Sequence, residues 1–156
     1  VVLIGCGTSL HASMVARYLL EDLAGIPAEV DNGSEYRYRS FHTDQRTLVI
    51  SVGQSGETAD TLAAMSSVLE KGGRLFTVCN VEGSQATRLA EGTMYMRSGP
   101  EIGVASTKTF IGSLIALSLL SVYLGQVRGY TDRARSREIV GNLARVPHLL
   151  GRILAD

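Results

Sequence analysis

The stretch TLVISVGQSGETADT, residues 47–61, changes from a continuous apolar run to a polar loop rich in glycine and hydroxyl side chains. An apolar run of this kind is typical of a strand that is buried on both faces of a parallel sheet. Apolar residues then recur at helical spacing over residues 56–71, and Gly72 and Gly73 end that pattern. The stretch therefore predicts a strand, a tight turn and a helix.

The same alternation extends in both directions along the chain. Strands are predicted at residues 1–5, 28–31, 47–53, 74–80 and 93–97. Helices are predicted at residues 9–23, 34–39, 56–71, 85–91 and 105–126. Strands separated by helices of this length favour an α/β fold, with a parallel sheet that carries helices on both faces.

The last 26 residues have a different pattern, with five arginines among apolar side chains. We interpret the arginines as a solvated face, and we expect Pro147 to kink this helix or divide it in two. Residues 1–128 are predicted to form one domain, and residues 129–156 a helical segment that leads to a second domain. The apolar side chains predicted to share one face are Ile139, Val140, Leu143, Val146, Leu150 and Leu154.

Composition narrows the classes of function. The chain has 156 residues, with 15 Lys and Arg against 15 Asp and Glu, so its formal net charge is zero. That balance gives no support for nucleic acid or an anionic membrane as a partner. Residues 110–127 carry no charge and approach the length of a membrane span. Because serine and glycine interrupt them, we interpret them as a buried helix.

The two cysteines, Cys6 and Cys79, stand far apart in the sequence and form no CxxC pair. We expect both to be buried free thiols in a reducing, cytoplasmic environment, with neither a metal nor a cofactor bound. No signal peptide is predicted. Because the chain begins in mid-strand, we expect it to be part of a longer protein.

Three strand-to-helix turns carry hydroxyl groups where a ligand of an open α/β sheet would bind. The turn at residues 5–9 has two glycines before Thr8 and Ser9. In the turn at residues 53–61, Ser55 is predicted to cap the helix and Thr58 to face the same free N–H groups. Residues 98–110 form the third, where Ser106 is predicted to help cap a helix. Such helix starts bind phosphate without a lysine.

A dinucleotide site is the alternative for the first turn, because residues 5–7 look like the start of a GxGxxG motif. Glu29 or Asp31 could then supply the acid that binds the ribose. Leu10, however, stands where the third glycine is needed, so the motif is incomplete. The turn at residues 53–61 contains no lysine, which also argues against a Walker loop and ATP hydrolysis.

Five segments in order resemble the sugar isomerase (SIS) domain family. They are CGTS at residues 6–9, SEYRYR at 34–39, QSGETADT at 54–61, CNVEGS at 79–84 and EIGVASTK at 101–108. The resemblance covers most of residues 1–125 and implies a flavodoxin-like, three-layer αβα sandwich with about five parallel strands. It also implies a site that binds a sugar phosphate.

The resemblance implies a role for particular residues. Ser9, Gln54, Ser55 and Thr58 match the positions that hold the phosphate in the family. Thr8, Val104 and Ser106 match positions that lie against the sugar. One position departs from the pattern, because Gly53 stands where the family usually has serine. The loss of that hydroxyl would weaken binding by roughly 0.5–1.5 kcal/mol if nothing replaces it.

Within the family, the segments are similar to the first isomerase subdomain of the glutamine–fructose-6-phosphate amidotransferases. These enzymes join ammonia from glutamine to fructose 6-phosphate and isomerise the product to glucosamine 6-phosphate. The resemblance implies that the catalytic residues lie in a second SIS domain and the tail, so none is assigned here, and that the chain binds rather than catalyses. Neither Lys108 nor the histidines His11, His42 and His148 match a catalytic position.

The expected partners are fructose 6-phosphate or glucosamine 6-phosphate, a second SIS domain and a second copy of the chain. The alternative function is that of a sensor module, since SIS domains also detect sugar phosphates in regulators.

Overall fold

The computed structural model of the chain describes residues 1–41, 43–103 and 105–155. Within these described residues, five strands and six helices alternate in the predicted order. The strands are β1 (Val2–Gly5), β2 (Glu29–Asn32), β3 (Leu48–Val52), β4 (Arg74–Cys79) and β5 (Gly92–Tyr95). The helices are α1 (Thr8–Ala24), α2 (Gly33–Tyr36), α3 (Ala59–Glu70), α4 (Gln85–Leu89), α5 (Lys108–Val127) and α6 (Arg133–Ile153).

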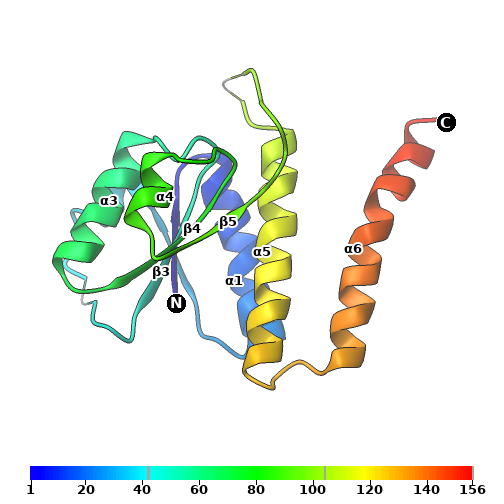
Figure 1. Cartoon of the computed structure of the whole chain (residues 1–156), viewed down its shortest axis with the longest axis horizontal. Coiled ribbons are helices and arrows are strands. Elements are labelled where there is room, and N and C mark those ends of the chain that lie inside the picture. The colour runs from blue at the N-terminus through cyan, green and yellow to red at the C-terminus, as the bar shows by residue number, and fades with distance from the viewer. Residues whose placement is uncertain (42, 104, 156) are drawn as a thin grey trace.

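The strands pair in parallel, in the order β2-β1-β3-β4-β5. Helices α1 and α5 pack on one face of the sheet, whereas α2, α3 and α4 pack on the other (Figure 1). This strand order is that of flavodoxin-like doubly wound sheets. The predicted three-layer αβα fold is therefore confirmed. Because all five strands are parallel, their carboxyl ends lie on the same side of the sheet.

The buried strand β1 shows how the sheet divides the core into two halves. Leu3 points into the half formed with α1 and α5, and Ile4 points into the half formed with α3. Both side chains are fully buried. A strand that is apolar on both faces can lie only in the middle of a layered fold, which is why the continuous apolar run predicts its place.

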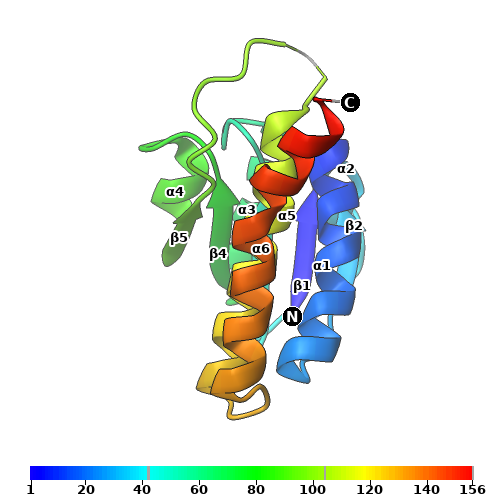
Figure 2. The same ribbon diagram turned by 90° about the vertical axis from the view of Figure 1, so that its right-hand side faces the viewer.

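Helix α5 is apolar nearly all round and, by length and composition, could cross a membrane. Here one of its faces packs against α1 and the sheet, with Ala116 and Leu117 in the core. Figure 2 shows α1 and α5 side by side in front of the sheet. The burial of this face agrees with the interpretation as a core helix. The opposite face exposes Ile111, Tyr123 and Val127.

Helix α6 continues as one helix through Pro147, so the expected division into two helices is wrong, whereas the alternative of a kink stays a prediction. Proline removes one N–H donor from the helix, and the hydrogen bonds on either side are enough to continue it. The helix begins where the Asp132 side chain accepts a hydrogen bond from the Arg135 amide at 2.7 Å.

The apolar face of α6 has little cover. The helix contacts α5, and Figure 1 shows it standing outside the three layers. The expected packing of this face holds only in part, because Ile139, Leu143 and Val146 are half-buried. The rest of the face is exposed, at Val140, Leu150 and Leu154.

Candidate functional site

The ends of β1 and β3 bring two of the hydroxyl-bearing turns together. Gly5 and Val52, the last residues of these strands, are register partners in the sheet. A Cβ atom added to Gly5 would lie 3.0 Å from the Ser9 carbonyl carbon and 3.1 Å from the Val52 carbonyl oxygen. Only glycine leaves room for so close an approach. The first turn of α1 is therefore packed against the end of β3, next to the loop that leads to α3.

The turn between β1 and α1 presents Thr8 and Ser9 at the start of the helix. Gly7 precedes the helix with φ +56°, a left-handed conformation that favours glycine. No side chain caps α1, and Thr8 and Ser9 are half-buried. The Ser9 amide donates to the Cys6 carbonyl at 3.2 Å and the Leu10 amide to the Gly7 carbonyl at 3.1 Å. The hydroxyls of Thr8 and Ser9 are therefore the donors that this turn can offer to an anion.

The loop between β3 and α3 is longer than the sequence predicts. Helix α3 begins at Ala59 rather than near Gly56, and Thr58 occupies the capping position. The Thr58 side chain makes no capping hydrogen bond and is exposed. The first-turn amides of α3 thus lack the side-chain partner that a capping threonine usually supplies.

Ser55 does not cap α3, so that prediction is wrong. Its hydroxyl oxygen accepts a hydrogen bond from the Glu57 amide at 3.1 Å. Serine closes a local turn in this way when the chain has not yet entered the helix. The hydroxyl keeps its own proton, so Ser55 can still donate to a ligand.

Helix α4 braces this loop from the side. A Cβ atom at Gly56, which has φ +66°, would lie 2.2 Å from the Ser84 hydroxyl oxygen. The Gly56 carbonyl accepts a hydrogen bond from the Ala86 amide at 3.0 Å. The Glu57 carboxylate accepts one from the Gln85 amide at 2.7 Å and so caps α4.

A small pocket lies under the same loop. Its interior holds about 10 Å³, which is room for about one water molecule. The buried hydroxyls of Ser51 and Thr77 also line it and are hydrogen-bonded to each other at 2.7 Å. A sugar cannot fit inside this pocket.

The loop before α5 is held by Glu101, which the sequence analysis did not single out as a cap. Its carboxylate accepts hydrogen bonds from the Thr107 amide at 3.0 Å, the Lys108 amide at 3.0 Å and the Thr107 hydroxyl at 2.9 Å. The Thr109 hydroxyl also donates to it. The hydrogen bonds from Thr109 and the Thr107 amide lower the pKa of Glu101 to about 2. The carboxylate is therefore ionised at neutral pH.

Helix α5 begins at Lys108, and neither Ser106 nor Thr107 caps it through a side chain. The prediction of a hydroxyl cap is wrong because Glu101, a charged and stronger acceptor, takes that place. The Ser106 hydroxyl is half-buried and lies 2.6 Å from the Thr109 hydroxyl. Lys108 donates to the Pro100 carbonyl at 2.6 Å. Val104, like His42, lies outside the described residues.

Asn80, just after β4, fixes the other end of this loop. Its side chain donates to the Gly99 carbonyl at 2.7 Å and accepts from the Ser98 amide at 2.9 Å. Its backbone amide donates to the Gln54 carbonyl at 3.0 Å. One asparagine thus ties the second loop to the third. The CNVEGS segment contained this residue, but only the fold shows which loops it joins.

The remaining candidate groups have structural or surface positions. Cys79 is buried, as predicted, and burial raises the pKa of its thiol. Cys6 is only half-buried, so its expected full burial is wrong. It follows β1, with Sγ 3.6 Å from the Thr61 hydroxyl oxygen. His11 and His148 are exposed on helices. Within the described ranges, no group of three or more His, Cys, Asp or Glu side chains is placed so that it could hold a metal ion.

A family model, that of the SIS domain, matches residues 1–123. The chain belongs to the SIS domain family. The SIS domain is 47% identical, over 99% of this chain, to an isomerizing glutamine–fructose-6-phosphate aminotransferase of Symbiobacterium thermophilum. It is 50% identical, again over 99% of this chain, to the enzyme of that name from Pseudomonas putida. In each case the chain spans 26% of the relative's length.

A solved structure agrees with this membership. The C-terminal domain of glucosamine-fructose-6-phosphate aminotransferase from Francisella tularensis superimposes with a TM-score of 0.89 at 32% identity. The match covers 93% of this chain and 41% of that one. The SIS domain is therefore homologous to the isomerase half of such enzymes.

Proposed function

We propose that this SIS domain is the phosphosugar-binding part of a glucosamine-6-phosphate synthase. The longer enzyme would join ammonia from glutamine to fructose 6-phosphate and isomerise the product. The domain itself would bind fructose 6-phosphate or glucosamine 6-phosphate and would not catalyse the reaction alone. Its relatives are metabolic enzymes, which supports a cytoplasmic location.

The start of α3 is the observation that carries the proposal. The Thr58 side chain leaves the first-turn amides of α3 without a cap, and the Ser55 hydroxyl stands beside them in the same loop. A helix start carries partial positive charge and unpaired donors, so it suits a phosphate group. Gln54, with Ser9 from the start of α1, would complete the phosphate site. Thr8, Ser106 and Val104 would lie against the sugar.

Calorimetry with matched sugars tests the proposal. The domain is expected to bind fructose 6-phosphate and glucosamine 6-phosphate, but not fructose or glucosamine, because the helix starts recognise the phosphate. Titration of the four compounds under one buffer condition measures the difference. Equal affinity for fructose and fructose 6-phosphate would contradict the proposal.

We also propose that residues 129–156 lead to a second SIS domain and that the chain forms a homodimer. The exposed face of α5 supports this, because Ile111, Tyr123 and Val127 are between 44% and 66% exposed. Apolar side chains that gather on one helix face in this way often mark an interface.

Sedimentation velocity over a range of concentrations is expected to show reversible association of the chain. Tyr123→Glu would place a charge on the exposed face of α5 and is expected to weaken that association. Tyr18→Glu, at an exposed tyrosine of α1, makes the same change of side chain and charge and serves as the control. A parent chain that stays strictly monomeric at high concentration would exclude the homodimer.

A further inference from the structure

Two acidic residues belong to the segment that would bind the phosphate. Glu57 is in the loop after β3, and Asp60 is in the first turn of α3. A sugar phosphate carries a charge of about −1.5 to −2 at neutral pH. Residues 53–61 contain no lysine or arginine, so this segment supplies no cation of its own. A dianion at the start of α3 therefore needs a positive charge from another element.

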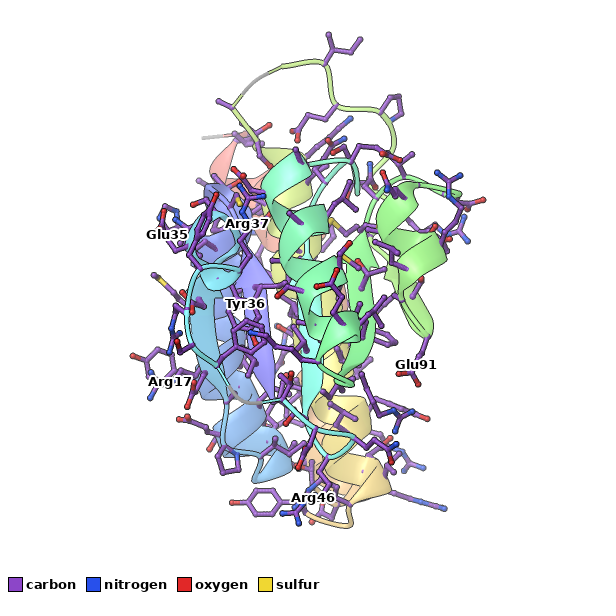
Figure 3. The ribbon with its side chains drawn as sticks, turned by 90° about the vertical axis from the view of Figure 1, so that its left-hand side faces the viewer. Arg17, Glu35, Tyr36, Arg37, Arg46 and Glu91 are labelled. Carbon is purple, nitrogen blue, oxygen red and sulfur yellow. The ribbon has the colours of Figure 1, made fainter. Side chains whose placement is uncertain are left out.

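Helix α2 brings an arginine to this place. One guanidinium nitrogen of Arg37 lies 3.9 Å from the Asp60 carboxylate, and the two side chains are 36% and 48% exposed. Among the ion pairs of the described residues, Asp60 has no other cation as partner. Figure 3 shows Arg37 towards the end of the molecule at which α3 begins, whereas Arg46 lies at the opposite end.

The position of Arg37 is set by its buried neighbour. Tyr36 is 2% exposed and stacks on Phe41, with 4.2 Å between the ring centroids. A Cβ atom at Gly33, the first residue of α2, would lie only 3.2 Å from the Thr61 hydroxyl oxygen, so α2 sits tightly against α3. With Tyr36 turned inward, the next residue is presented at the surface beside Asp60.

The guanidinium itself is oriented by the following residue. It lies 4.6 Å from the centroid of the Tyr38 ring and donates to the Tyr38 hydroxyl at 2.5 Å. Contact with an aromatic ring restricts the motion of an arginine without removing its charge. The charge of Arg37 is thus held near the start of α3, beside Asp60.

We propose that Arg37 is a positioning residue for the phosphosugar: it balances the charge of Asp60 so that a phosphate dianion can bind at the start of α3. The inference rests on the proposed function. The other arginine of the same segment differs, because Arg39 pairs with Asp31 on β2. Arg74 pairs with Glu91 at 2.8 Å. It is the first residue of β4, so it lies at the amino-terminal ends of the strands, away from the start of α3.

Calorimetry with fructose 6-phosphate on four variants of the 156-residue chain tests the role. Arg37→Gln is expected to weaken binding about threefold to tenfold, since it leaves Asp60 to repel the phosphate. Arg37→Gln combined with Asp60→Asn is expected to return the affinity to within about twofold of the parent. Arg37→Lys should keep most of the affinity because it keeps the charge. Arg74→Gln, the matched control, should bind like the parent.

The outcomes separate the inference from the proposal beneath it. If the parent chain binds no sugar phosphate, the proposed function fails and the role of Arg37 fails with it. If the parent binds and Arg37→Gln binds equally well, only the role of Arg37 is overturned. The same holds if the double variant stays as weak as Arg37→Gln, because charge balance would then not be the cause. Melting temperatures of all variants show whether a loss of binding reflects a loss of folding.

Discussion

Replacing Thr58 by valine is expected to weaken fructose 6-phosphate binding about tenfold to a hundredfold while the fold survives. A hydrogen bond to a charged group contributes about 1.5–3 kcal/mol, which corresponds to that range of affinity. Valine keeps the shape of threonine and removes only the hydroxyl. Because the Thr58 side chain does not cap α3, its removal should leave the melting temperature nearly unchanged.

Ser55→Ala is the companion variant and should weaken binding by a similar factor. Ser55 accepts a hydrogen bond from the Glu57 amide, which is exposed and can turn to water instead. Removal of the Ser55 hydroxyl should therefore lower the free energy of unfolding by less than the roughly 1 kcal/mol that is typical of a lost helix cap. Calorimetry and thermal unfolding of both variants measure the two effects. If both bind fructose 6-phosphate like the parent, the loop after β3 is not the phosphate site.

Gly125→Ala is expected to destabilise the domain by about 1–3 kcal/mol or more, because overpacking displaces buried backbone. Gly125 is buried in α5, and an added Cβ atom would lie 2.1 Å from the Leu23 carbonyl oxygen of α1. It would also lie 2.9 Å from the Thr131 hydroxyl oxygen, which donates to the same carbonyl. Helices α1 and α5 would have to move apart.

Gly141→Ala is the matched control for this effect. Gly141 lies inside the exposed helix α6, and a Cβ atom there meets no heavy atom within 4 Å. Alanine is favoured over glycine in such a position by about 0.8–1 kcal/mol, so no loss of stability is expected. Urea unfolding measures the free energy of unfolding of both variants. A Gly125→Ala chain as stable as the parent would show that the close approach of α5 to α1 does not matter for folding.

The order of the strands and helices along the chain can be predicted from local sequence patterns. Apolar periodicity is a local property, and a run such as residues 47–52 must be buried on both faces wherever it lies. Parallel strands end at one edge, so the hydroxyl-bearing turns after β1, β3 and β5 had to lie on the same side of the sheet. The fold class and the elements that carry the candidate site follow from these two facts.

The groups that accept hydrogen bonds from the first amides of each helix depend on how the loops pack together. Ser55 and Ser106 look like caps in the sequence, but Glu101 takes the place at α5 and Glu57 turns to α4. The partner of a backbone amide is whichever acceptor the fold brings nearest, and these acceptors come from other loops. No local pattern could place Arg37 beside Asp60, which stands 23 residues further along the chain. The two residues meet because α2 packs against α3.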